Sequence, residues 1–139
     1  DISAVSLHRV LATAMKMDAI NEWGSVVALT YIAAQRVFPD YNEMADAKAL
    51  LESITRSFGY HYGVKKHVRV KGFDGFMDYA EKMSPLGNAS SDECANYCVM
   101  MFSDLTRKVT MQNLFHDGGF SFTGVTEAVI EKMETPSAP

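Results

Sequence analysis

The stretch that decides the fold reads SVVALTY at residues 25–31, an apolar run that does not alternate with polar side chains. A strand of this kind is typical of a parallel sheet that is covered on both faces. A helical pattern follows from near Tyr41, and residues 64–70 read as a second strand. Residues 25–70 therefore predict a strand, helix, strand unit, and the crossover of such a unit is right-handed.

The helix of this unit has a sharp start and a gradual end. Pro39 blocks any earlier helix, Asp40 can cap the first turn, and Glu43 stands three residues later, as in a capping box. Gly59 and Gly63 weaken the helical pattern toward its end. The apolar stripe that we expect to pack on the sheet consists of Met44, Ala47, Leu51, Ile54 and Phe58.

Further elements on either side of this unit complete an α/β pattern. An amphipathic helix is predicted over residues 3–20, another helix over residues 73–83, and a third from Ser90 or Ser91, either of which can cap it. The remaining predictions are a short strand around residues 111–115, a turn at residues 117–119 and a disordered tail at residues 135–139.

Composition narrows the class of protein. The chain has 139 residues, of which 47% are hydrophobic and 22% charged, and its net charge is -4. This size suits one domain with a real core, and the acidic balance argues against a non-specific nucleic-acid binder. The longest apolar run, residues 26–29, is far shorter than the ~20 residues that cross a membrane. No signal peptide is recognisable at the start, so we expect a cytoplasmic protein.

The cysteines and histidines indicate no metal site. Cys94 and Cys98 lie four residues apart in a predicted helix, where a disulfide between them is unfavourable, so we expect buried, reduced thiols. The histidines, which form no ligand spacing with these cysteines, are His8, His61, His67 and His116.

The candidate chemistry lies beyond the first strand, because ligands of open parallel sheets bind at the carboxyl ends of the strands. Tyr31 ends that strand, and Tyr41 begins the helix that follows. Lys48 stands seven residues after Tyr41, which is about 700° of rotation and about 10 Å of rise, so the two side chains share one face. A phenol beside an ammonium can stabilise a developing oxyanion. Spacing alone also allows Tyr41 to be a helix-start residue and Lys48 a solvated side chain.

A longer string favours the chemical interpretation. Residues 30–48, TYIAAQRVFPDYNEMADAK, resemble the active-site region of the bacterial NADH-dependent enoyl-acyl-carrier-protein reductases, which are divergent members of the short-chain dehydrogenase superfamily. Their signature is a tyrosine separated by six residues from a lysine, with a second tyrosine ten positions earlier. Tyr31, Tyr41 and Lys48 match all three positions, and Ala45 stands where an ordinary superfamily member has its lysine. Further landmarks in the same order are Asp1–Ser3, Val68–Val70, Ser84–Leu86, Phe102–Leu105 and His116–Phe120.

The resemblance implies a Rossmann-type α/β fold with a doubly wound parallel sheet, in which residues 1–139 form the C-terminal part of a single reductase domain. It implies reduction of trans-2-enoyl thioesters on acyl carrier protein with NADH. Tyr41, Tyr31 and Lys48 would be catalytic. Lys48, Leu29 and Tyr31 would contact the cofactor, and Tyr31, Tyr41 and Met44 the substrate.

Two departures from the family pattern bear on function. The family's glycine-rich turn and its adenosine-contacting residues precede the position of Asp1, so we expect this stretch alone not to bind a dinucleotide. Val70 is followed at once by Lys71, where the family has a segment beside the nicotinamide and a substrate lid. We therefore predict that these two residues are not adjacent in the natural protein; a true deletion would make it an inactive relative.

Other interpretations stay open beside this one. A carbonyl or alcohol dehydrogenase of the same superfamily is disfavoured by Ala45, and an inactive homologue could serve as a subunit. Tyr62 and Lys66 form a literal Tyr-x-x-x-Lys, which we interpret as coincidence because Gly63 falls between them. The family forms tetramers, and a second row of small or apolar residues on the same helix predicts such an interface: Ala49, Leu50, Ser53 and Ser57.

Overall fold

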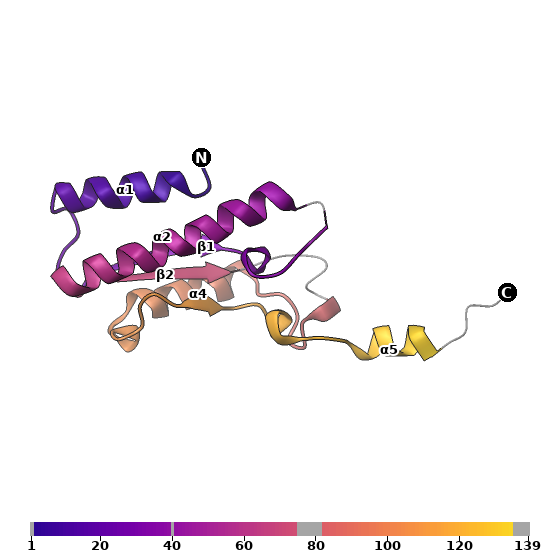
Figure 1. The fold of residues 1–139 in the computed structure, drawn as a ribbon. Coiled ribbons are helices and arrows are strands. Elements are labelled where there is room, and N and C mark those ends of the chain that lie inside the picture. Colours follow the sequence, from indigo (N-terminus) through magenta and orange to yellow (C-terminus); the bar gives the residue numbers. More distant parts are fainter. Residues whose placement is uncertain (1, 40, 75–81, 135–139) are drawn as a thin grey trace.

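The fold is a three-stranded parallel sheet with helices on both faces, in the order β1-β2-β3. The computed structural model describes residues 2–39, 41–74 and 82–134. In Figure 1, α1 and α2 lie on one side of the sheet and α4 on the other, with α5 beyond the last strand. The predicted α/β class with a doubly wound parallel sheet is confirmed. The bounds are α1 Val5–Lys16, β1 Ser25–Thr30, α2 Asn42–Lys66, β2 Arg69–Asp74, α4 Ser91–Phe102, β3 Asn113–Phe115 and α5 Glu127–Glu134.

The main core lies between the sheet and the α1–α2 layer. The stripe predicted for α2 supplies Leu51, Ile54 and Phe58, all buried, and Leu11 of α1 packs with them. The hydroxyl of Tyr62 donates a hydrogen bond of 2.9 Å to the carbonyl of Leu11, which fastens the two helices. Burial, then the charge of nearby Asp18, raises the pKa of this phenol.

Helix α2 is longer than the sequence predicts. It runs through Gly59 and Gly63 to Lys66 and ends at His67, which has a left-handed φ of 55°. The strand predicted over residues 64–70 is therefore wrong at its start, since the first three of these residues are helical. Gly59 does not weaken the helix but permits close packing, because a Cβ there would lie 2.6 Å from Met111 Cγ.

The start of α2 also differs from the expected capping box. Tyr41 occupies the N-cap position and makes no side-chain cap hydrogen bond, although Glu43 lies in the first turn as expected. Asp40, the expected cap, lies outside the described residues. Tyr41 thus joins the loop to the helix, a position that leaves its ring free to pack toward β1.

Strand β2 does not end at Val70 as the sequence predicts. It continues through Lys71 to Asp74 and pairs with β1 along its whole length, with Val70 opposite Val26 and Lys71 opposite Val27. The buried ammonium of Lys71 donates hydrogen bonds of 2.5 Å to the Met101 carbonyl and 2.9 Å to Thr106 Oγ1. These bonds let a lysine occupy a fully buried strand position.

The ends and coverage of three further elements also bear on the sequence predictions. Strand β1 is unevenly covered, since Ala28 and Thr30 are buried whereas Leu29 is 60% exposed. Residues 73–74, predicted to be helical, belong to β2, while residues 75–81 and the tail at 135–139 lie outside the described residues. The predicted cap of α4 is confirmed, because Ser90 and Glu93 form a capping box.

The cysteines can now be placed. Cys94 and Cys98 are free thiols that are half-buried rather than fully buried, and the described residues hold no group of three or more potential metal-binding side chains. Burial, more than the nearby Cys98 and Glu93, raises the pKa of the Cys94 thiol. None of the helices within the described ranges has the length and apolar character needed to cross a membrane.

Candidate active site

The sequence-predicted residues meet at the carboxyl end of β1. Tyr31 follows the strand directly and is 4% exposed, and it precedes a short 3-10 helix, η1, at Ile32–Ala34. Tyr41 reaches the same place from the start of α2. The two rings stack edge to face, with centroids 5.1 Å apart and planes at 72°. The ten-residue spacing of the two tyrosines thus becomes a direct contact.

Lys48 approaches this end of the strand from the second turn of α2. Its ammonium donates a hydrogen bond of 2.9 Å to the main-chain carbonyl of Leu29, two residues before Tyr31. Tyr41 and Lys48 therefore both face the end of β1, as their seven-residue spacing predicts. A lysine ammonium carries three donors, so Lys48 can hold this carbonyl and still donate to a ligand.

A second apolar cluster supports the tyrosine pair. Phe38 stacks at a tilt on Tyr31, with ring centroids 5.5 Å apart, and Phe120 lies 6.3 Å beyond Phe38. Ala45, which replaces the usual lysine of the wider superfamily, packs against this cluster. Two segments that lie far apart in the sequence, residues 31–45 and residues 83–120, therefore build this cluster. Its members are Tyr31, Ile32, Ala33, Phe120, Phe38, Tyr41, Ala45, Met83 and Phe115.

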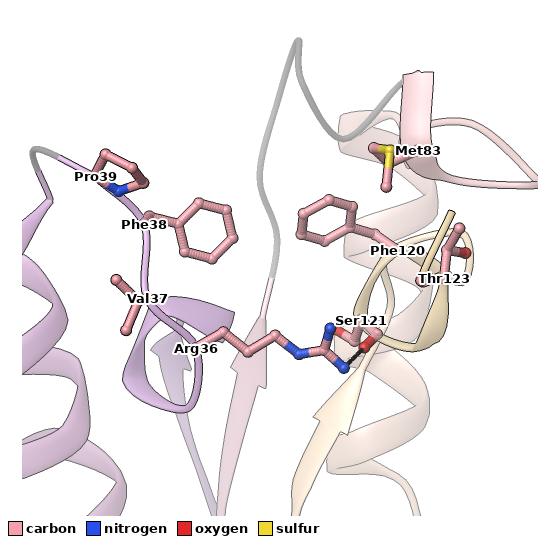
Figure 2. A pocket seen from close by; sticks show the side chains of 9 residues that line it. Arg36, Val37, Phe38, Pro39, Met83, Phe120, Ser121 and Thr123 are labelled. Atoms are coloured by element: carbon pink, nitrogen blue, oxygen red, sulfur yellow. Dashed lines mark hydrogen bonds between the residues drawn. The ribbon is translucent and has the colours of Figure 1, made fainter. Parts of the chain in front are cut away.

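A pocket of about 520 Å³ opens beside this cluster. Figure 2 shows Phe38 and Phe120 facing each other across it, with Met83 above them and Arg36 crossing below. The Arg36 guanidinium donates a hydrogen bond to the carbonyl of Ser121, which joins the loop after β1 to the loop after β3. The sequence alone singled out neither Arg36 nor the two phenylalanines for this pocket.

The predicted turn after β3 is confirmed, and it positions Phe120. The Asp117 carboxylate accepts hydrogen bonds from the main-chain NH groups of Gly119, at 3.1 Å, and Ser121, at 2.9 Å. Gly118 has φ 61°, and a Cβ there would lie 2.0 Å from the carbonyl oxygen of Gly87. Only glycine fits this close approach, so the DGG sequence fixes the loop that carries Phe120.

Two further sequence predictions concern Met44 and the pair of Tyr62 and Lys66. Met44 is 39% exposed and does not line the pocket, so its substrate contact stays a prediction. Tyr62 and Lys66 lie at the other end of α2, where Tyr62 bonds to Leu11 and Lys66 Nζ bonds to the Ile20 carbonyl at 3.0 Å. Both side chains therefore have structural roles, which agrees with the interpretation of this Tyr-x-x-x-Lys motif as a coincidence.

Comparison with known proteins places this geometry in a family. The sequence profile described as Enoyl-(Acyl carrier protein) reductase matches residues 1–72 and 65–121. The chain therefore belongs to this family. The two matched stretches overlap at residues 65–72, which include Val70 and Lys71. The separation of these two residues in the natural protein stays a prediction.

Individual relatives agree with the family. The enoyl-[acyl-carrier-protein] reductase [NADH] FabI of Bacillus subtilis is 32% identical over 140 residues, covering 88% of this chain and 53% of the relative. The crystal structure of a FabI-NADH complex from Alistipes finegoldii shares 56% identity and a TM-score of 0.86, covering 89% of this chain and 50% of that one. A Plasmodium berghei enoyl-acyl-carrier-protein reductase with triclosan has a TM-score of 0.81 at 30% identity, covering 90% of this chain and 50% of that chain. The chain spans about half the length of the curated relatives it matches.

Proposed function

We propose that the full-length protein reduces the carbon–carbon double bond of trans-2-enoyl thioesters on acyl carrier protein, with NADH as the reductant. The observation that carries this proposal is the edge-to-face pair of Tyr31 and Tyr41 at the end of β1, beside the ammonium of Lys48. The names of the relatives give the same reaction for those proteins. Ala45, in place of a lysine, supports this reaction over carbonyl or alcohol chemistry.

Tyr41 has the central role in the proposed mechanism. Reduction at the β-carbon leaves an enolate whose charge lies largely on the thioester oxygen. The Tyr41 phenol would donate a hydrogen bond to this oxygen, because a preorganised donor stabilises charge that develops in the transition state. Tyr31, whose ring contacts Tyr41, would supply a second hydroxyl near the substrate.

The residues of this chain fit one end of the cofactor. Lys48 keeps donors beyond its bond to the Leu29 carbonyl, and ribose hydroxyl groups are suitable acceptors for them. Leu29 and Tyr31 lie beside it at the strand end. NADH, when bound, supplies the hydride that reduces the substrate. We therefore assign Lys48, Leu29 and Tyr31 to the nicotinamide-ribose end of the cofactor site.

The acyl chain would occupy the apolar pocket between the two loops. Its volume of about 520 Å³ lies within the ~300–1,000 Å³ typical of small-molecule sites. Phe38 and Phe120 offer apolar walls, and Phe38 packs against Tyr31. Met44, which does not line this pocket, is proposed as a further substrate contact. This arrangement supports a substrate with a reactive polar end at the tyrosines and an apolar tail.

The proposed assembly is a homotetramer. The second row on α2, formed by Ala49, Leu50, Ser53 and Ser57, is exposed in the single chain, so no described part of the chain covers it. Small side chains in such a row permit close approach of a second helix. The location we propose is the cytoplasm, in keeping with a substrate carried on acyl carrier protein.

A substrate panel tests the proposed reaction. The full-length protein is mixed with NADH and either crotonyl-coenzyme A or acetoacetyl-coenzyme A, and NADH oxidation is followed. We expect turnover of the enoyl thioester and little of the ketone. Preference for the ketone would favour the dehydrogenase alternative, and inactivity of correctly folded, NADH-binding protein on both substrates would favour the inactive homologue.

A further inference from the structure

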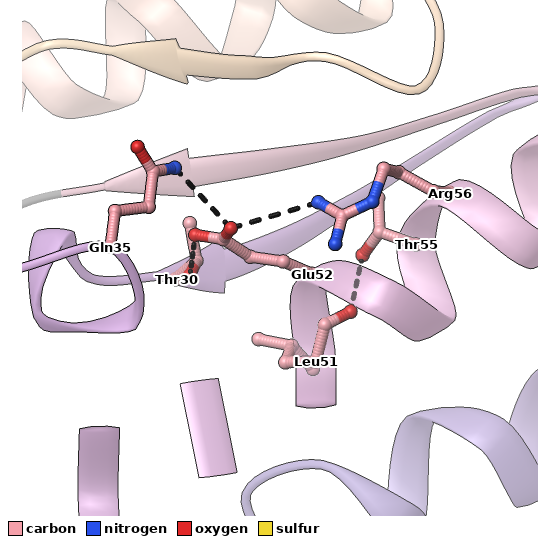
Figure 3. Close-up of polar contacts among 6 residues, drawn as sticks. All are labelled: Thr30, Gln35, Leu51, Glu52, Thr55 and Arg56. Atoms are coloured by element: carbon pink, nitrogen blue, oxygen red, sulfur yellow. Dashed lines mark hydrogen bonds and ion pairs between the residues drawn. The ribbon is translucent and has the colours of Figure 1, made fainter. Parts of the chain in front are cut away.

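A buried carboxylate that sequence reasoning did not single out lies one helical turn beyond Lys48. Glu52 of α2 is 5% exposed and points toward the end of β1. Figure 3 shows Thr30, Gln35 and Arg56 converging on it from the strand, from the loop after η1 and from α2 itself. Burial of a carboxylate is costly unless hydrogen bonds compensate it, so these contacts need an explanation.

The contacts of Glu52 bracket Tyr31. Thr30 Oγ1 donates a hydrogen bond of 2.9 Å to Oε1, and Gln35 Nε2 donates one of 3.3 Å to Oε2. Thr30 immediately precedes Tyr31, and Gln35 is the C-cap residue of the short helix that follows it. The carboxylate therefore ties the chain on both sides of Tyr31 to the helix that carries Tyr41 and Lys48.

Glu52 and Lys48 hold successive residues of β1. Lys48 binds the carbonyl of Leu29, and Glu52, one turn further along α2, binds the hydroxyl of Thr30. The cation nearest to the Glu52 carboxylate, Arg56, is 53% exposed and lies 3.7 Å away, too far for a strong hydrogen bond. The hydrogen bond from Thr30, and the longer one from Gln35, thus dominate the position of this carboxylate.

We propose that Glu52 is a positioning residue for enoyl reduction, which sets Tyr31 against Tyr41 by fixing the turn between β1 and η1. This inference rests on the proposed function. Glu52 acts through Tyr31, since its contacts are to the residues on either side of that tyrosine. A displacement of about 1 Å in an active site can cost about 100-fold in rate.

The test compares substitutions at Glu52 in the full-length protein, with crotonyl-coenzyme A and NADH as probes. Glu52→Ala should lower kcat about 10- to 100-fold, with a smaller change in KM. Glu52→Gln should restore most of kcat, because an amide can still meet both Thr30 and Gln35. Asp46→Ala, which removes an exposed carboxylate from the same helix, is the matched control and should retain wild-type kcat.

A double-mutant cycle separates positioning from general stabilisation. If Glu52 acts through Tyr31, Glu52→Ala should reduce kcat little further in a Tyr31→Phe background. Should Glu52→Ala not fold, Thr30→Val removes the hydrogen bond that Glu52 accepts from the strand. The effect of Thr30→Val on kcat should likewise shrink in the Tyr31→Phe background.

The outcomes distinguish this inference from the proposed function. Additive effects, or kcat within about twofold of wild type for folded Glu52→Ala, would overturn the positioning role while leaving the reaction intact. Absence of enoyl reduction by the wild-type protein would instead overturn the proposed function, on which the inference depends.

Discussion

Replacement of Lys71 by methionine addresses the buried lysine in β2. Burial, and secondly the charge of Arg69, lower the pKa of the Lys71 ammonium from 10.5 to about 8. The unfolded chain therefore binds more protons than the folded chain between these pH values, and the free energy of unfolding should rise with pH there. The full pKa change corresponds to about 3 kcal/mol, since one pKa unit is worth about 1.4 kcal/mol. Between about pH 7.5 and about pH 10, the expected rise from this lysine is about 2 kcal/mol.

Urea unfolding of the wild-type chain and Lys71→Met at several pH values measures this contribution. The difference between the two proteins should favour methionine most at neutral pH and shrink as pH rises. The Met101 carbonyl keeps its bonds from Ser25 and Thr106 in the variant, so few polar groups lose a partner. Lys65→Met, at an exposed position on α2, is the control and should follow the wild-type profile. Parallel profiles for wild type and Lys71→Met would refute the burial of this lysine and the continuation of β2 through it.

Three further substitutions have defined outcomes. Lys48→Ala in the full-length protein should weaken NADH binding about 10- to 100-fold in calorimetry, and unchanged affinity would remove Lys48 from the cofactor site. Ser90→Ala should cost about 1 kcal/mol in urea unfolding by loss of the α4 cap. The main-chain NH of Ser90, and then its hydroxyl, donate hydrogen bonds that hold the pKa of Glu93 below its usual value, so stability due to this carboxylate is lost as pH falls through that lowered pKa. Ser90→Ala removes only the bond from the hydroxyl and should reduce this acid sensitivity in part. Gly118→Ala should cost at least about 1–2 kcal/mol, whereas Gly124→Ala, with no atom within 4 Å of the added Cβ, should cost less.

The sequence predicted the parts of the site that local spacing controls. Tyr31 is recognisable because it ends an apolar run, and Tyr41 and Lys48 because two helical turns bring them to one face. The structure confirms that all three lie at the end of β1. The capping box of α4 was predictable for the same reason, since Ser90 and Glu93 are three residues apart.

Features that depend on tertiary contact were not predictable in this way. Phe38 and Phe120 meet across the pocket although they lie far apart in the sequence, and Glu52 is recognisable only once α2 is docked on the end of β1. Gly59 was interpreted as a helix-weakening residue, whereas its missing side chain admits Met111. The extension of β2 through Lys71 depends on the distant acceptors Met101 and Thr106.

The turnover of Tyr41→Phe in the full-length protein tests the central claim most directly. The substitution keeps the ring that packs on Tyr31 and removes only the hydroxyl proposed to stabilise the enolate. With crotonyl-coenzyme A and NADH, kcat should fall about 100- to 1,000-fold, while Tyr60→Phe, at an exposed tyrosine further along α2, should match the wild type. A loss of less than about threefold for Tyr41→Phe would contradict the assignment of this hydroxyl as the oxyanion donor.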